Sequence, residues 1–111
     1  MSPFELGFLE SSYKEWNLLD NSIRQEFEKK LITRLQNPRN VGSALTGNLR
    51  NCFKIKSHRY GYRLTYLVEE DSNMVIVLAI GKRERSDVYD KTLLRLSNLL
   101  KTENKETPPL K

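Results

Sequence analysis

The sequence predicts an α+β fold: one small domain in which an antiparallel sheet carries two N-terminal helices on one face and ends in a third helix. Apolar residues recur at helical spacing near both ends of the chain, and short apolar–polar alternations fill its middle. Turn-forming residues separate these alternations. A chain of 111 residues has room for a single hydrophobic core and not for two.

The N-terminal part predicts one strand and two helices. Residues 4–8 alternate at period two, which is typical of a strand. A short helix follows, marked by apolar residues at helical spacing: Leu9, Tyr13, Trp16 and Leu19. The second helix begins near residues 20–22, where Ser22 and Gln25 have the spacing of a capping box, and it ends before Pro38. Its apolar positions share one face, which we expect to pack on the sheet: Ile23, Phe27, Leu31 and Leu35.

The rest of the chain predicts a loop, three strands and a last helix. The loop spans residues 40–48, and the strands span about 52–57, 62–69 and 74–83, joined by turns short enough for antiparallel hairpins. The last of these strands is apolar from Met74 to Ile80, as in a central strand covered on both faces.

The C-terminal helix runs from Ser86, its expected N-cap, to about Leu100. Three leucines form its apolar stripe: Leu93, Leu96 and Leu100. We therefore expect a folded domain over residues 1–101 and a mobile tail over residues 102–111, which are polar and contain two adjacent prolines.

Composition excludes several classes of protein. Hydrophobic residues make up 38% of the chain and charged residues 30%, which is typical of a soluble globular protein. No apolar run approaches the roughly 20 residues of a membrane span, and the first residues lack the pattern of a secretion signal. A single cysteine rules out an internal disulfide. We expect a cytoplasmic protein without membrane contact.

Positive charge gathers in the predicted strands. The net charge is +5, and no acidic residue lies between positions 50 and 63. The cations of this segment are Arg50, Lys54, Lys56, Arg59 and Arg63. A segment of one sign attracts an anionic partner, most often nucleic acid, although a solvated basic hairpin would give the same pattern.

Strand alternation directs several of these cations to one face. Lys54 and Lys56 point away from the apolar residues between which they lie. If the N-terminal helices cover the apolar face, the opposite face carries both lysines, Arg63 and, at a strand end, Arg83. Three separate segments then build one basic groove, which favours nucleic-acid binding over a solvated surface.

The residues that are missing restrict the chemistry of this groove. His58 is the single histidine, so a two-histidine ribonuclease site cannot form within one chain. No acids cluster near the groove and no phosphate-binding glycine loop is present, which argues against a metal or nucleotide cofactor. Cys52 lies inside a predicted strand, where we interpret it as a small buried hydrophobe.

Metal-free phosphoryl transfer remains. RNA supplies a 2′-hydroxyl as nucleophile, so a protein must remove its proton, stabilise negative charge and help the 5′-oxygen leave. A guanidinium forks onto phosphate oxygens. A lysine can accept the proton only in its neutral form; the pKa of a free lysine is about 10.4, and neighbouring cations lower it.

Motifs spread along the chain resemble those of the RelE toxins of type II toxin–antitoxin systems, within the RelE/ParE superfamily. The resemblance reaches from the first strand into the last helix. It rests on Lys-Glu-Trp at 14–16, Asn-Pro-Arg at 37–39, Leu-Thr-Gly at 45–47, Cys-Phe-Lys-Ile-Lys at 52–56, Gly-Tyr-Arg-Leu-Thr-Tyr at 61–66 and Gly-Lys-Arg-Glu-Arg-Ser-Asp-Val-Tyr at 81–89. It implies the RelE-like microbial ribonuclease-type fold.

The resemblance also implies a reaction: cleavage of mRNA in the ribosomal A site without a cofactor, leaving a 2′,3′-cyclic phosphate. The family's active-site residues fall on Lys54, Lys56, Arg63, Arg83 and Tyr89. We expect Lys54 to be the base with Lys56 tuning it. Arg63 would hold the scissile phosphate, and Arg83 the leaving oxygen or the transition-state charge. Tyr89 would stack on a nucleotide, unless it is a core residue.

The implied partners are mRNA on the ribosome, ribosomal RNA and a RelB-like antitoxin, whose complex with the toxin would bind operator DNA. Contacts to RNA or the ribosome are expected from Arg50, His58, Arg59, Lys82 and Arg85. The alternative is a non-enzymatic toxin or RNA-binding module of the same fold, as in the ParE sister family that poisons gyrase and generally lacks this catalytic set.

Overall fold

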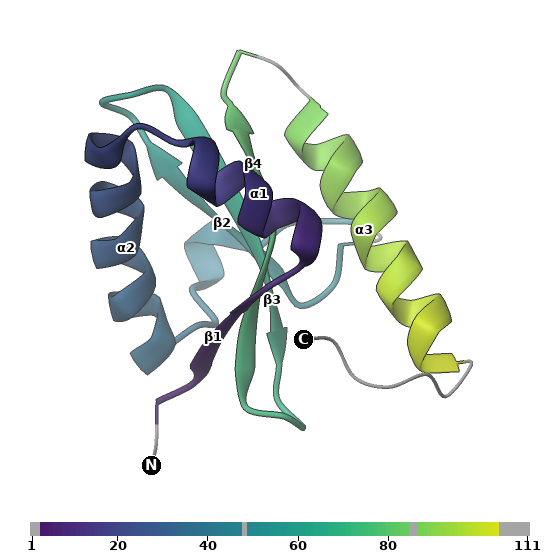
Figure 1. Cartoon of the computed structure of the whole chain (residues 1–111). Helices are drawn as coiled ribbons and strands as arrows, with labels where there is room; N and C mark the ends of the chain where they lie inside the picture. Colours follow the sequence, from purple (N-terminus) through teal and green to yellow (C-terminus); the bar gives the residue numbers. More distant parts are fainter. Residues whose placement is uncertain (1–2, 48, 85–86, 105–111) are drawn as a thin grey trace.

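The structure, a computed structural model, describes residues 3–47, 49–84 and 87–104 (Figure 1). Its four strands form one sheet in the order β1-β4-β3-β2, and Figure 1 shows α2 and α3 on opposite sides of the strands. In chain order the elements are β1 (Glu5–Phe8), α1 (Glu10–Leu18), α2 (Asn21–Gln36), the 3-10 turn η1 (Val41–Ser43), β2 (Cys52–Ser57), β3 (Tyr62–Glu69), β4 (Met74–Lys82) and α3 (Asp87–Asn104).

Strands β2, β3 and β4 form the antiparallel meander that the sequence predicts. The strand β1 differs, because it pairs with β4 in the parallel direction and makes the sheet mixed. Parallel neighbours need a long crossover, which the two helices and the meander between β1 and β4 supply. Pairing with β1 ends at Val77, so in the described part of the chain the outer edge of β4 has no strand partner from Leu78 onward.

Helix α2 packs on one face of the sheet, and Trp16 of α1 packs against the same core cluster. From α2, Ile23, Phe27 and Leu31 are buried. They pack on apolar side chains of β2, β3 and β4: Phe53, Ile55, Leu64, Tyr66, Val68, Val75, Val77 and Ile80. The capping box expected at Ser22 is wrong, because α2 already begins at Asn21 and places this serine inside the helix.

Helix α3 covers the other face with a different stripe from the one predicted. Leu96 is buried as expected, but Leu93 and Leu100 are 43% and 51% exposed. The buried positions of α3 are Val88, Thr92, Leu96 and Leu99. The helix continues to Asn104, so residues 102–104, which we expected in a mobile tail, are helical. The remainder of that tail, residues 105–111, lies outside the described residues, as does the expected N-cap Ser86.

None of the helices within the described ranges combines the length and the apolar character of a membrane span.

Candidate functional site

Three strands bring four cations to one end of the sheet. Lys56 of β2 lies opposite Arg63 of β3, and Arg63 lies opposite Gly81 of β4. Lys54 is two residues before Lys56 and therefore shares its face. Arg83 follows β4 directly, and its backbone N–H donates to a carbonyl of the β2–β3 turn at 2.7 Å. The structure thus brings together the four residues that the sequence predicts to form a basic groove.

The charges of this cluster act on one another. The pKa of Lys56 is lowered from its ordinary value of 10.5, first by the charge of Lys54, then by desolvation, and then by Arg63 and Arg83. Each neighbouring cation disfavours a further positive charge on the Lys56 amine. Lys56 therefore loses its proton more readily than a free lysine, which is the direction that a base requires.

A β-bulge in β4 determines the face on which Arg83 lies. Val77 and Ala79 lie opposite adjacent residues of β3, so Leu78 between them is an extra residue. In a regular strand, alternation would direct Arg83 to the face covered by α1 and α2. The bulge reverses the alternation, and Arg83 falls on the face that carries Arg63.

Tyr89, in the first turn of α3, contacts this cluster. The guanidinium carbon of Arg63 lies 5.4 Å from the centre of the Tyr89 ring, which is a cation–π distance. Arg63 Nε is buried and has no hydrogen-bond partner among the described residues. Across the same residues, none of the four cations forms an ion pair with a carboxylate. The positive charge of the cluster is therefore left for an anion from outside.

Two hollows adjoin the four cations. One of about 460 Å³ lies at the free edge of β2 and is lined by Lys30, Thr33, Arg34, Gly42, Ser43, Lys54, Ile55, Lys56 and His58. The other, of about 420 Å³, is lined by Tyr60, Gly61, Arg63, Lys82, Arg83 and Glu84. Four cations line the first hollow and three line the second, so both hollows fit an anionic chain.

The five residues expected to bind RNA around the site are distributed unevenly. His58 and Lys82 are exposed and line the two hollows. Arg59 is exposed and lines a separate hollow against α2. Arg50 lies at the opposite end of the β2–β3 hairpin, beside Leu67 and Leu99 in a hollow of about 470 Å³. Arg85 lies outside the described residues.

Two cations of α2 also reach β2, and neither belongs to the predicted site. Lys30 Nζ donates to the carbonyl of Lys56 at 2.7 Å, and Arg34 donates to the carbonyl of Lys54 at 3.3 Å. Because β2 is an edge strand, these side chains take the place of a neighbouring strand. The signal in the sequence is their four-residue spacing, which puts both on one side of the helix.

Other reactive groups contribute little to this site. Cys52 is buried under α3, as predicted, and burial raises the pKa of its thiol to about 12, so it carries no thiolate at neutral pH. Within residues 3–47, 49–84 and 87–104, no group of three or more His, Cys, Asp or Glu side chains could hold a metal ion.

Known proteins are similar to this chain in sequence and in fold. Residues 8–87 match the family described as ParE toxin of type II toxin–antitoxin system, parDE. The chain is also 41% identical over 91 residues to the mRNA interferase toxin RelE of Escherichia coli strain K12, which covers 82% of this chain and 95% of that protein. The chain belongs to the RelE toxins of type II toxin–antitoxin systems.

Solved RelE structures have the same fold as this RelE-type chain. An arginine double mutant of Escherichia coli RelE in the free state matches it with a TM-score of 0.80 and 37% identity, covering 86% of this chain and 99% of that one. A chain of the intact Escherichia coli RelBE toxin–antitoxin complex matches with a TM-score of 0.70 and 39% identity, covering 74% and 99%. The predicted family and fold class are confirmed.

Proposed function

We propose that this RelE-type toxin is a metal-independent endoribonuclease that cuts mRNA in the A site of the ribosome. The observation that carries the proposal is the cluster of four cations without carboxylate partners in the described structure, one of which, Lys56, has a lowered pKa. A protein 41% identical to this chain is named an mRNA interferase toxin, which supports RNA as the substrate.

The reaction transfers phosphorus from one oxygen to another within the RNA. A neutral lysine takes the proton of the 2′-hydroxyl, the 2′-oxygen attacks phosphorus, and the bond from phosphorus to the 5′-oxygen breaks. The 5′-oxygen then takes up a proton, and the products are a 2′,3′-cyclic phosphate and a 5′-hydroxyl end. The lowered pKa of Lys56 favours Lys56 as the base over Lys54, our choice from sequence. Lys54 can return a proton as an ammonium.

The arginines stabilise the charge that develops on the phosphate. Arg63 binds the scissile phosphate through a guanidinium that Tyr89 orients by stacking. Arg83 stabilises the transition state or the leaving oxygen. It does so as a cation and not as a proton donor, because an arginine pKa lies above about 12.

Dependence on the ribosome follows from the weakness of this site. The chain has one histidine, and that residue is exposed in the turn after β2. The base is a lysine, and the hollows beside it are open to solvent. Such a site needs a second macromolecule to hold the RNA in a reactive geometry, and in our proposal the ribosome does so.

We further propose that a RelB-like antitoxin neutralises the toxin in the cytoplasm by covering the basic face, and that the complex binds operator DNA. A RelE toxin of similar fold forms the RelBE complex, which supports such a partner. Co-expression with the neighbouring open reading frame tests this. We expect restored growth and a stable complex; toxicity that persists, with no complex, would contradict the pairing.

The decisive experiment for the reaction is cleavage on programmed ribosomes. We expect a cut within the A-site codon, a 2′,3′-cyclic phosphate at the new end, and little cleavage of the same RNA without ribosomes. Efficient cleavage of naked RNA at the same protein concentration would overturn ribosome dependence.

A second candidate function is a non-enzymatic toxin, because the matching family is described as ParE toxin. It predicts that the chain binds its target and leaves programmed ribosomes with intact mRNA. Inhibition of gyrase by the purified protein, with mRNA uncut, would favour this alternative over the ribonuclease.

A further inference from the structure

The outer edge of β4 is held by side chains where β1 ends. The Ser12 hydroxyl of α1 donates to the Val77 carbonyl at 2.6 Å. Arg95 of α3 donates to the carbonyl of the bulge residue Leu78 at 2.8 Å. The N–H of Ile80 donates to Glu15 Oε1 of α1 at 3.1 Å. Two helices thus hold the bulge that directs Arg83 to the catalytic face.

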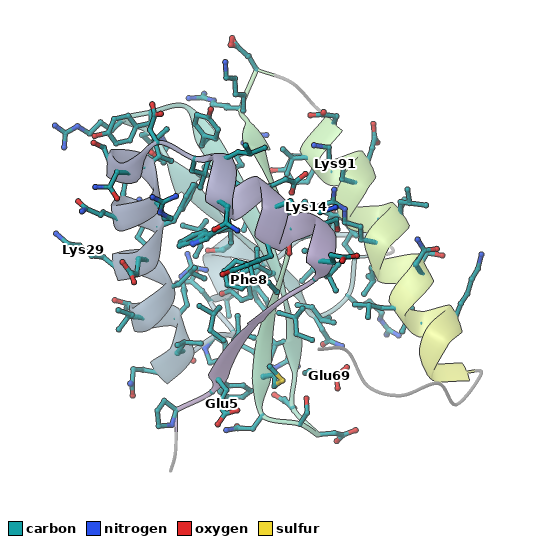
Figure 2. All side chains as sticks on the ribbon, viewed as in Figure 1. Glu5, Phe8, Lys14, Lys29, Glu69 and Lys91 are labelled. Carbon is teal, nitrogen blue, oxygen red and sulfur yellow. The ribbon has the colours of Figure 1, made fainter. Side chains whose placement is uncertain are left out.

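Glu15 connects these two helices. Its carboxylate accepts two hydrogen bonds from Arg95, at 2.9 and 3.0 Å, and one from Lys91 at 3.1 Å. Figure 2 shows Lys91 on the side of α3 that is turned toward α1. Burial alone would raise the pKa of Glu15, but the hydrogen bonds from Arg95, Ile80 and Lys91 lower it below its ordinary value. The group is therefore a carboxylate at neutral pH.

The position of α3 determines the geometry of the site. Tyr89, which stacks on Arg63, is two residues before Lys91. Val88 packs so closely on Gly81 that a Cβ there would lie 2.5 Å from the valine methyl. Any shift of α3 therefore moves Tyr89 relative to Arg63.

We infer that Glu15 is a positioning residue of the ribonuclease site: through the β4 bulge and α3 it fixes Arg83 and the Arg63–Tyr89 stack. A partly buried ion pair is a poor device for stability alone, since apolar replacements of such pairs often cost nothing. Glu15 and Arg95 are 19% and 17% exposed, and between them they bind the backbone on both sides of Ala79. The kinetic part of this inference rests on the proposed function.

The test is Glu15→Gln, which keeps an oxygen for the Ile80 N–H and removes the charge that pairs with Arg95 and Lys91. The Nε–H signal of Arg63 in the NMR spectrum reports the stack, because the Tyr89 ring shifts it. We expect this signal to move away from its ring-shifted position. On programmed ribosomes we expect the single-turnover rate at saturation to fall by about 10- to 100-fold. Ribosome affinity should change by roughly twofold or less.

Ser12→Ala is the matched control. It removes a buried hydrogen bond between α1 and the same edge of β4, and within the described residues none of the hydrogen bonds of Ser12 reaches α3. We expect Ser12→Ala to lower stability and to leave the Arg63 signal, which reports the position of α3, as in the parent. If Glu15→Gln does not fold, Lys91→Met removes one partner of the carboxylate and should move the signal in the same direction.

The inference is overturned if Glu15→Gln, or Lys91→Met where the first variant does not fold, leaves the Arg63 signal unchanged. It is also overturned if Ser12→Ala moves this signal as far. The NMR measurement needs no RNA. A parent protein that does not cleave mRNA would therefore refute the proposed function, while the signal would still decide whether Glu15 positions Arg63.

Discussion

At the scale of single residues, neighbouring charge and burial act in opposite ways on reactivity. The Lys56 amine lies at the surface, and the charge of Lys54 is the largest cause of its lowered pKa. Cys52 is an intrinsically better nucleophile, but burial raises its pKa to about 12. The lysine that we propose as the base is therefore activated first by neighbouring like charge and only secondarily by desolvation.

Removing Lys54 should raise the pKa of Lys56, because the neighbouring charge that lowers this pKa most is lost. If Lys56 is the base, cleavage accelerates as pH rises through its pKa, so Lys54→Met should move the inflection of the pH–rate profile to higher pH. The check is single-turnover cleavage on programmed ribosomes between about pH 6 and pH 9.5. If Lys54 is the base, Lys54→Met removes the rise with pH instead. Lys29→Met, on the exposed side of α2, should keep the parent profile.

Arg83→Ala separates catalysis from binding. Arg83 is exposed, so fold stability should change little. Loss of a group that stabilises the transition state should lower the single-turnover rate by about 100-fold. Ribosome affinity should fall much less, because many cations share that contact. Arg50→Ala, at the other end of the hairpin, should affect binding alone. If Arg83→Ala cleaves like the parent and Arg50→Ala does not, the active site is assigned to the wrong place.

The sequence predicts the cluster but not the residues that position it. Alternation in β2 and β3 and the resemblance to RelE toxins were enough to name Lys54, Lys56 and Arg63. Glu15 and Arg95 bind backbone groups of β4 from distant helices. Such contacts join a side chain to a backbone atom far away in the sequence. They leave no periodic pattern to detect.

At the scale of elements, β4 shows why strand faces could not be assigned fully. Every residue from Met74 to Ile80 is apolar, so no alternation reveals that Leu78 is an extra residue. Helix α3 presents a similar ambiguity, because leucines at 93, 94, 96, 99 and 100 permit more than one apolar stripe. Which side of α3 faces the sheet depends partly on a polar pair, the hydroxyls of Thr65 and Thr92, which lie 2.7 Å apart in the core.

Gly81→Ala tests how closely α3 must approach β4. The added Cβ would lie 2.5 Å from Cγ2 of Val88, so α3 must move away. Overpacking of this kind lowers the free energy of unfolding by about 1–3 kcal/mol, and cleavage should slow as Tyr89 moves. Urea unfolding measures the first effect. In the double variant, Val88→Ala should restore part of the lost stability, so the two changes in the free energy of unfolding should not add.

The control is Gly42→Ala, whose new Cβ meets its nearest neighbour, Asn40 Oδ1, at an ordinary 3.7 Å. It should be close to neutral in stability. Equal stability of the Gly81→Ala and Gly42→Ala proteins would show that α3 can shift freely at this point.

At the scale of the whole molecule, α1, the sheet and α3 meet at Glu15. Helix α1 provides the carboxylate, β4 an N–H and α3 two cations. The four cations of the site, in contrast, have no carboxylate partner in the described residues. Ion pairing thus joins α1 to α3, while the cations of the proposed site have no such partner in the described residues.

This arrangement makes stability depend on pH through Glu15. Its pKa in the folded protein lies below the ordinary value of 4.5, so as pH falls the unfolded chain takes up a proton first. The stabilisation is complete above pH 4.5 and is lost as pH falls through the lower, folded-state pKa. Glu15→Gln cannot titrate, so it should be less stable than the parent at neutral pH, by up to about 3 kcal/mol because the pair is only partly buried, and the gap should close in acid.

Urea unfolding of both proteins at a series of pH values from neutral to acid measures that gap. Glu26, whose pKa is also lowered, titrates equally in both proteins and cancels in the difference. Glu10→Gln removes an exposed carboxylate from the same helix and should give a small gap at every pH. A gap for Glu15→Gln that stays constant into acid would mean that the side chain stabilises the fold by its shape and not by its charge. The ion pairs with Lys91 and Arg95 would then not be what joins α1 to α3.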